Sequence, residues 1–308
     1  MTLEIAVTSP SFSRNKVLVN ELRKLFSSIK LNTEGSRFNQ EQLIQFLSTA
    51  QGAIVGLDII NKEVLGCLPD LKIISKYGVG LDNIDQVSMR EHDVTLGWTP
   101  GVNKYAVAEQ TIGCMIGLAR NLFGSSRSIV NGSWIKYGGF QLREATVGLI
   151  GLGNVGQQVV KLLRPFGCNI LANDVENREQ FAREWAVNLV DKERIFTESN
   201  IISLHVPFTI DTENMINRNV LNVMKNNSFL INTSRGGIVN EIDLRDALQQ
   251  KIISGACCDV FTKEPCLDNP LIQLDNFFAT PHIGGNSKEA ILAMGRSAIE
   301  HLRKYFYG

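Results

Sequence analysis

The sequence predicts an α/β fold with two domains, each built on an open parallel sheet. The chain has 308 residues, and at roughly 150 residues per domain this length suggests about two domains. Short runs of β-branched residues alternate with helical stretches, which is typical of parallel strands joined by right-handed crossovers. The alternation stops at a turn-rich segment, residues 97–101, and restarts near residue 146. This break predicts a boundary between two domains.

The first domain is expected to contain four strands with helices between them. In the helix expected over residues 16–26, the apolar side chains of Val17, Leu18, Leu22, Leu25 and Phe26 fall on one side. The expected strands lie near residues 3–7, 53–55, 72–75 and 93–96, and the other helices near 41–47 and 61–65. A long helix rich in small residues is then predicted over residues 104–120, followed by a stretch interpreted as polar.

The second domain is expected to repeat the β-α alternation. Its strands are predicted near residues 147–150, 170–172, 201–204, 229–231 and 253–258. A second turn-rich segment, residues 281–285, precedes a final helix over residues 287–305. One economical arrangement returns this helix to the first domain, but the sequence pattern leaves that choice open.

The composition favours a small-molecule partner. The 31 Lys and Arg residues balance the 31 Asp and Glu residues, so neither nucleic acid nor an anionic membrane is an expected partner. No apolar run approaches the ~20 residues that a membrane-spanning helix needs. The amino terminus lacks a signal-peptide pattern and leads into a strand, which predicts a cytoplasmic protein.

Cysteine and histidine give no sign of a metal site. The six cysteines form no CxxC pair, and most lie in apolar segments, so reduced thiols are expected. His92, His205, His282 and His301 form no cluster with ligand spacing. The sequence therefore predicts no metal cofactor.

A glycine-rich turn joins the first strand of the second domain to the helix that follows. Gly151, Gly153 and Gly156 form a GxGxxG pattern, with Asn154 and Val155 between the second and third glycines. Such glycines permit a tight turn, a close backbone approach to a pyrophosphate and close packing of helix on strand. The helix terminus adds partial positive charge. The turn predicts a dinucleotide site, against the alternative of a purely structural turn.

The next predicted strand ends at Asp174, 18 residues after Gly156. A carboxylate at this position accepts hydrogen bonds from the ribose hydroxyls and repels a 2′-phosphate. Asp174 therefore favours NAD over NADP. The alternative is an ordinary solvated aspartate.

Three later segments place Arg235, Glu264 and His282 after strands, where ligands of open α/β sheets bind. Each residue alone has a plain interpretation as a surface or capping group. Together they supply a carboxylate binder, a carboxylate that orients a base, and a general acid/base beside a dinucleotide site. This combination predicts the interconversion of a 2-hydroxy acid and a 2-keto acid.

Several segments resemble the D-isomer-specific 2-hydroxyacid dehydrogenase family, in its short, phosphoglycerate dehydrogenase-like form. The resemblance covers essentially the whole chain, and the order of the motifs is specific for the family but much less so for the substrate. The segments are residues 76–85, 151–156, 205–207, 232–237, 264–265 and 280–285.

The resemblance implies a role for each residue of the site. Arg235 would hold the substrate carboxylate and the reacting oxygen, His282 would be the general acid/base, and Glu264 would bind the other imidazole nitrogen. The backbone amides of residues 77–80 would form an anion nest for the same carboxylate. The residues implied to bind substrate are thus Tyr77, Gly78, Val79, Gly80, Arg235 and His282. Those implied to contact the cofactor, beyond the glycine turn and Asp174, are His205, Val206, Pro207, Thr233, Asp259 and Gly284.

The resemblance also implies an architecture. Residues 1–99 and 285–308 would form a flavodoxin-like substrate domain, and residues 100–284 an NAD-binding Rossmann domain. The active site would lie in the cleft between the domains. Relatives dimerise through the nucleotide domain, so a homodimer is expected.

The physiological acid stays open at this point. Lys76 and Lys136 are basic where phosphoglycerate-oxidising relatives tend to carry phosphate-binding residues, but Gly56 stands where those relatives commonly have an arginine. Glyoxylate, hydroxypyruvate and larger aliphatic 2-keto acids are alternatives, whereas Val79 argues against phosphite oxidation. A hypothesis from another class is a non-catalytic NAD(H)-sensing scaffold, because corepressors share this fold.

Overall fold

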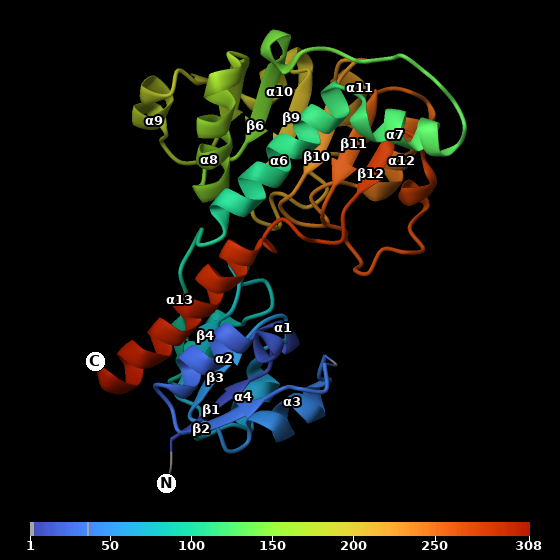
Figure 1. Ribbon diagram of the computed structural model, residues 1–308. Helices are drawn as coiled ribbons and strands as arrows, with labels where there is room; N and C mark the ends of the chain where they lie inside the picture. Colours follow the sequence, from blue (N-terminus) through green and yellow to red (C-terminus); the bar gives the residue numbers. More distant parts are fainter. Residues whose placement is uncertain (1–2, 36) are drawn as a thin grey trace. The chain divides into compact units, whose positions relative to one another are not determined.

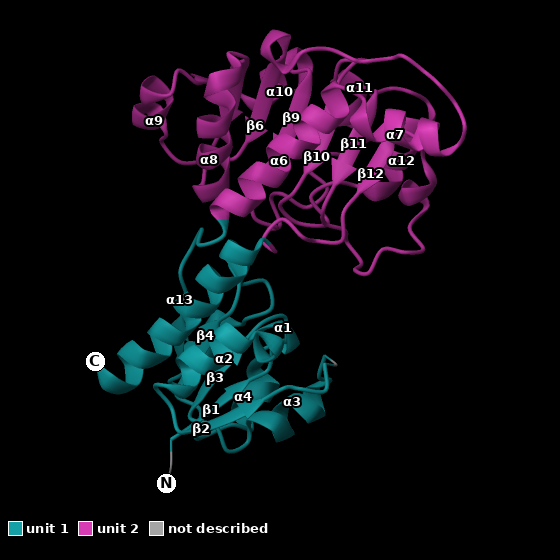
Figure 2. Cartoon of the chain, in the orientation of Figure 1, with its two compact units in different colours: residues 1–103, 287–308 teal, residues 104–286 magenta. Residues whose placement is uncertain are grey.

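The computed structural model describes residues 3–35 and 37–308 of the chain (Figure 1). The described chain divides into two compact units, shown in separate colours in Figure 2. Unit 1 contains residues 1–103 and 287–308, apart from the residues that are not described, and unit 2 contains residues 104–286. Both units are built on parallel sheets, so the predicted α/β fold class is confirmed.

Unit 1 has a five-stranded parallel sheet in the order β2-β1-β3-β4-β5. Adjacent strands pair in register; Ala6, for example, lies opposite both Lys30 and Ala53. The strands are β1 (Glu4–Val7), β2 (Ser28–Leu31), β3 (Gly52–Val55), β4 (Ile73–Lys76) and β5 (Thr95–Gly97). The helices are α1 (Pro10–Arg14), α2 (Lys16–Arg23), α3 (Gln40–Leu47), α4 (Lys62–Gly66), α5 (Gln86–Glu91) and α13 (Lys288–Tyr307).

Helices cover both faces of this sheet, which explains why its central strands are apolar throughout. Side chains alternate between the faces along a strand. Ile54 therefore packs with residues of α2 and α13, whereas Ala53 and Val55 pack with residues of α3, α4 and α5. The last helix thus completes the apolar core of unit 1, and Ser75 Oγ donates a hydrogen bond to the carbonyl of Ala298 in α13 at 2.8 Å.

Unit 2 has a seven-stranded parallel sheet in the order β12-β11-β10-β9-β6-β7-β8. Its strands are β6 (Thr146–Ile150), β7 (Asn169–Asn173), β8 (Asn188–Leu189), β9 (Ile201–Leu204), β10 (Phe229–Asn232), β11 (Gly255–Cys258) and β12 (Phe277–Ala279). Its α-helices are α6 (Lys104–Ala119), α7 (Leu122–Val130), α8 (Asn154–Leu163), α9 (Glu179–Glu184), α10 (Lys192–Glu198), α11 (Arg218–Val223) and α12 (Glu241–Gln249). Short 3-10 turns lie at Leu142–Glu144, Arg164–Phe166 and Pro270–Gln273.

The core of unit 2 also lies on both faces of the sheet. Helices α6 and α8 pack with Val147 and Leu149 on one face, whereas α10, α11 and α12 pack with Ile150 and Ile202 on the other. Pro165 follows α8, and Gly167 adopts a φ of 73°, so the chain leaves the helix and enters β7. The candidate site lies at the carboxyl ends of these packed strands.

Three features differ from the sequence predictions. Strand β2 was not predicted, because it is an edge strand whose four residues are only half-buried and show no apolar run. The short strands β8 and β12 were also absent from the predicted set. The stretch interpreted as polar contains helix α7, none of whose residues is buried, although Ile129 and Val130 are apolar.

Candidate active site

The predicted site residues of unit 2 follow strands that end at the same level of the sheet. The strand pairing aligns Asn173, Ile150, Leu204, Asn232, Cys258 and Ala279 as neighbours across six strands. The next residue on each strand is therefore Asp174, Gly151, His205, Thr233, Asp259 and Thr280, in the same order. Parallel strands thus bring residues that are distant in sequence into one row, the edge of the sheet where ligands of this fold class bind.

The glycine-rich turn lies where the strand order reverses, between β6 and β9. Gly151 has a φ of 100°, and a Cβ there would be 2.4 Å from the His205 carbonyl oxygen. A Cβ on Gly156 would be 2.1 Å from the Gly151 carbonyl oxygen. A Cβ on Gly153 would meet no described atom within 4 Å, so the space beside this N-cap of α8 is open. The glycine-rich turn therefore leaves room for a pyrophosphate at the N-terminus of α8, whose first two residues are Asn154 and Val155.

Asp174 closes one side of this turn. Its Oδ2 accepts a hydrogen bond from the Leu152 backbone N–H at 2.6 Å, and its Oδ1 accepts one from Glu176 N–H at 2.8 Å. The carboxylate is thereby fixed beside the glycine turn, where a ribose would follow the pyrophosphate.

His282 and Glu264 form the pair that the sequence suggested. Glu264 Oε2 lies 2.8 Å from His282 Nδ1, and Glu264 Oε1 accepts a hydrogen bond from Phe261 N–H at 3.0 Å. The His282 side chain is about half exposed, at 47%. Because Glu264 engages Nδ1, the pair leaves Nε2 as the nitrogen that can meet a reactant.

The backbone of His282 is held in an unfavourable conformation by its neighbours. Its φ is 55°, a left-handed value that costs an L-residue roughly 1–2 kcal/mol. Asp259, which is 1% exposed, holds the loop in place. Its Oδ1 accepts hydrogen bonds from Thr280 Oγ1 at 2.5 Å and Ile283 N–H at 2.9 Å, and its Oδ2 accepts one from Gly284 N–H at 2.8 Å. Asp259 therefore positions the loop that carries the imidazole.

Arg235 lies in a turn that Asn232 stabilises. The Asn232 side chain accepts hydrogen bonds from Ser234 N–H and Oγ and donates one to the Arg235 carbonyl at 2.8 Å. Arg235 Nη1 donates to the Ser234 carbonyl at 2.7 Å. A Cβ on Gly236 would be 2.0 Å from the Phe261 carbonyl oxygen, so this turn packs against the loop that leads to Glu264.

Helix α6 supports the row of strand ends through residues that the sequence analysis missed. Gln110 Nε2 donates to Thr280 Oγ1 at 2.9 Å, and Thr280 in turn donates to Asp259. Thr111 Oγ1 lies 2.8 Å from the hydroxyl of Thr233, one of the residues expected to contact the cofactor. The available signal was that Gln110 and Thr111 are polar and lie just before a long apolar run of this helix.

The three residues from His205 to Pro207 differ in how far they are exposed to solvent. The His205 side chain is partly buried, and desolvation lowers its pKa to about 4. Its Nε2 lies 2.9 Å from Ser203 Oγ, whereas its buried Nδ1 has no hydrogen-bond partner in the part of the chain that the structure describes. Val206 packs on the core and Pro207 is exposed. The His205 carbonyl and the Val206 side chain lie against Gly151, so this segment packs on the glycine turn.

The predicted nest, residues 77–80, follows β4 in unit 1. Gly78 has a φ of 142°, and the Val79 carbonyl accepts a hydrogen bond from Trp98 Nε1 at 2.9 Å. Tyr77 packs edge-on against Phe12, and burial raises the pKa of its phenol. Its role and that of Gly80 in substrate binding stay predictions.

Lys76 differs from the expectation of a phosphate-binding residue. It is 4% exposed, and its Nζ donates hydrogen bonds to the Gly56 carbonyl and to Asn83 Oδ1, both at 2.6 Å. A buried ammonium needs such partners, so Lys76 is engaged in holding unit 1 together. Lys136 is exposed in unit 2.

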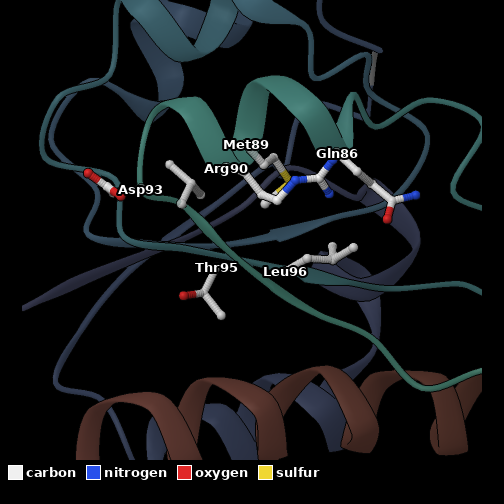
Figure 3. A pocket seen from close by; sticks show the side chains of 7 residues that line it. Gln86, Met89, Arg90, Asp93, Thr95 and Leu96 are labelled. Carbon is white, nitrogen blue, oxygen red and sulfur yellow. The ribbon is translucent and has the colours of Figure 1, made fainter.

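Neither of two hollows in the structure is lined by Arg235, Glu264 or His282. One is in unit 1, with α5 side chains such as Met89 and Arg90 on one side and Thr95 and Leu96 of β5 on the other (Figure 3). It contains none of the predicted site residues. The other is in unit 2 and is lined by Asp174, Glu176 and Arg178, among others.

Neither a metal cluster nor a membrane helix is found among the described residues. No group of three or more His, Cys, Asp or Glu side chains is placed to hold a metal ion in residues 3–35 and 37–308. Over the same ranges, every helix is too short or too polar to cross a bilayer.

Comparison with known proteins identifies the family. Residues 112–284 match the family described as D-isomer specific 2-hydroxyacid dehydrogenase, NAD binding domain. The chain is 34% identical to a hydroxypyruvate reductase of Thermotoga maritima, over 95% of this chain and 98% of the relative. The chain therefore belongs to the D-isomer-specific 2-hydroxyacid dehydrogenase family, with an NAD-binding domain in unit 2.

Other relatives are similar over different lengths. A D-3-phosphoglycerate dehydrogenase of Methanocaldococcus jannaschii is 36% identical over 87% of this chain but only 52% of its own length. The chain thus spans about half the length of that relative. Among solved structures, an acyclic imino acid reductase in complex with NADPH and D-Arg aligns with a TM-score of 0.88, at 28% identity, over 98% of this chain and 97% of the other.

Proposed function

We propose that the protein is an NAD-dependent dehydrogenase that interconverts a D-2-hydroxy acid and the corresponding 2-keto acid. The observation that carries this proposal is the His282–Glu264 pair, with 2.8 Å between Nδ1 and Oε2. The loop bearing His282 begins at Thr280, in the same row of strand ends as Gly151 of the dinucleotide cradle. An acid/base group beside a dinucleotide site suits the oxidation of an alcohol to a ketone.

His282 moves the proton. In keto-acid reduction its Nε2 donates a proton to the reacting oxygen, and in hydroxy-acid oxidation it removes the hydroxyl proton. Glu264 fixes the tautomer through Nδ1 and stabilises the imidazolium when it forms. Asp259 is a positioning residue, because its hydrogen bonds hold the backbone of the His282 loop.

Arg235 binds the substrate carboxylate. A guanidinium offers two parallel N–H groups that match a carboxylate, which an ammonium cannot reproduce. We propose that the backbone amides of Tyr77, Gly78, Val79 and Gly80 bind the same carboxylate.

NAD fits the residues of unit 2. When bound, NADH supplies the hydride that adds to the C2 carbon of the keto acid. The glycine turn would hold the pyrophosphate, and Asp174 the ribose hydroxyls. The residues proposed to lie along the rest of the cofactor are His205, Val206, Pro207, Thr233, Asp259 and Gly284.

A screen of 2-keto acids tests the proposal. The protein is mixed with NADH and, in turn, glyoxylate, hydroxypyruvate, phosphohydroxypyruvate and longer aliphatic 2-keto acids, and the loss of NADH absorbance is followed. We expect turnover with at least one acid. An NAD(H)-sensing scaffold would instead bind NADH and oxidise none of it, and that result would contradict the proposal. The Lys76 ammonium already donates hydrogen bonds within unit 1. We therefore do not expect Lys76 to give phosphohydroxypyruvate an advantage over acids without a phosphate.

We also propose that the protein is a homodimer that associates through α7 and the segment after it, drawn in green in Figure 1. Apolar side chains are exposed here, including Val130 at 83% and Trp134 at 78%. Large apolar side chains that are exposed close together in the sequence support a protein contact here. Light scattering after size exclusion should give a dimer mass for the parent protein and a smaller mass for a Val130→Ser, Trp134→Ser double variant. Val223→Ser, also at an exposed apolar residue, should stay dimeric. A cytoplasmic location without nucleic-acid partners stays a prediction.

A further inference from the structure

Asp174, which follows β7, lies beside the guanidinium of Arg178. Arg178 is the N-cap residue of α9, four residues after Asp174. Its Nε lies 3.5 Å from Asp174 Oδ2, and its Nη2 lies 2.8 Å from Glu176 Oε2. All three side chains line the hollow of unit 2 that begins at the end of β7.

The three side chains differ in how far they are exposed to solvent. The Asp174 side chain is 9% exposed and Arg178 is 25% exposed, whereas Glu176 is 69% exposed. The Arg178 Nε is buried, and no acceptor among the described residues satisfies it with a hydrogen bond. The guanidinium therefore has unused donor capacity, although it is held from two sides by carboxylates.

This arrangement bears on how the site distinguishes NADH from NADPH. In this fold class an acid at the end of the second strand selects NAD, whereas a nearby arginine accommodates the 2′-phosphate of NADP. Here the chain carries both groups. Two carboxylates and one guanidinium leave a net negative charge on the cluster, which repels the additional phosphate.

We propose that Arg178 is a latent binding group for the 2′-phosphate, and that Glu176 keeps it from serving that role. This inference deepens the proposed function and rests on the NAD site that it assigns to unit 2. Asp174 repels the phosphate directly. Glu176 acts through Arg178, because its ion pair with the guanidinium holds that group and its charge opposes the phosphate. Together, Glu176 and Arg178 set how strongly the site rejects NADPH.

Dissociation constants for NADH and NADPH test this inference without any keto acid. They are measured from the change in nicotinamide fluorescence on binding to the parent protein, Glu176→Gln, Arg178→Gln and the double variant. Glu176→Gln should tighten NADPH binding about tenfold, the scale of a charge-assisted hydrogen bond, and leave NADH binding nearly unchanged. Arg178→Gln should weaken NADPH binding. The double variant should lose the gain that Glu176→Gln produces.

A matched control separates this effect from a general change in charge. Glu184 is exposed at the end of α9 and does not line the hollow, so Glu184→Gln should leave both dissociation constants unchanged. An unchanged NADPH constant in Glu176→Gln would overturn the inference, and so would tighter NADPH binding in Arg178→Gln. If the constants shift as expected but no keto acid is reduced, the proposed reaction fails and the inference stands. Failure of every variant to bind either cofactor would overturn both.

Discussion

Two strands on either side of the glycine turn in the unit 2 sheet, β7 and β11, are each followed by an aspartate, and the two aspartates have different surroundings. Asp174 after β7 and Asp259 after β11 are both carboxylates just beyond a strand, and both accept backbone N–H hydrogen bonds. Asp259 is 1% exposed and bonds to the loop of His282. Asp174 lines a hollow and has Arg178 beside it.

In the proposed function, the residues around Asp259 serve the reaction, and those around Asp174 serve the distinction between NADH and NADPH. Beyond β11, the buried Asp259 carboxylate accepts three hydrogen bonds from the loop in which His282 adopts a left-handed conformation. Beyond β7, the Asp174 carboxylate lies 3.5 Å from the Arg178 guanidinium, and we propose that this pair faces the ribose of the cofactor. Substitutions at His282 and Asp259 should therefore change kcat, whereas substitutions at Asp174 and Arg178 should change cofactor affinity.

The largest expected effect is at His282. His282→Gln removes the proton carrier, so kcat for keto-acid reduction should fall by roughly 10²–10⁴, the usual contribution of a general acid. The NADH dissociation constant should change by less than about twofold, since the residue is assigned no part in cofactor affinity. Steady-state rates and nicotinamide fluorescence measure the two quantities. Turnover close to that of the parent protein would remove His282 from the mechanism.

Asp259→Asn should have the next largest effect. Its amide N–H₂ would face the N–H of Ile283 or Gly284 and leave a buried donor unsatisfied, at a cost of about 1–3 kcal/mol. We expect kcat to fall by about 10–100-fold as the His282 loop shifts. Asp268→Asn, at an exposed acid, is the control and should keep kcat. An unchanged kcat in Asp259→Asn would contradict the positioning role, and a fall in NADH affinity alone would leave Asp259 only its proposed contact with the cofactor.

Asp174→Ala should change affinity rather than rate. Loss of charged hydrogen bonds to the ribose should weaken NADH binding by about tenfold and reduce the preference for NADH over NADPH. At saturating NADH, kcat should stay within about twofold of the parent value. Titration of each cofactor, followed by rates at saturation, gives both quantities. An unchanged cofactor ratio would mean that the ribose is recognised elsewhere.

The smallest effect on activity is expected for His205→Gln. The prediction for this residue concerns how the free energy of unfolding depends on pH. Burial lowers the pKa of His205 to about 4, below the ordinary value of about 6.5. The unfolded chain therefore binds more protons between these values, so stability present above about pH 6.5 is lost as the pH falls toward 4. For this group alone the loss between about pH 8 and pH 5 is about 2 kcal/mol.

His205→Gln removes the titrating group, so its unfolding free energy should decline less over the same pH interval. Chemical denaturation of both proteins at the two pH values measures the difference. Equal declines would show that the buried ring does not couple folding to pH.

The buried strands and the loops that follow them could be predicted from the sequence, because both leave a pattern in consecutive residues. A strand such as β3, buried on both faces, is apolar throughout, and the polar residues that follow such strands mark the ligand edge. The edge strand β2 and helix α7 lack these patterns, since neither is buried on two sides. Periodicity therefore could not indicate them.

Contacts between segments distant in sequence could not be predicted in the same way. Lys76 looked like a phosphate ligand in the sequence, yet Gly56 and Asn83 hold its ammonium in unit 1. The support that Gln110 gives to Thr280 joins residues 170 positions apart. Such hydrogen bonds depend on how the helix crosses the sheet, which residue spacing does not specify.

The most direct test of the account is a crystal structure of the protein with NADH and oxamate, an unreactive analogue of a 2-keto acid. We expect the oxamate carboxylate to lie against the Arg235 guanidinium. Its amide carbonyl oxygen should lie within about 3 Å of His282 Nε2, a hydrogen-bond distance. Oxamate bound away from both side chains, with NADH in the glycine cradle, would contradict the assignment of these residues to the chemistry.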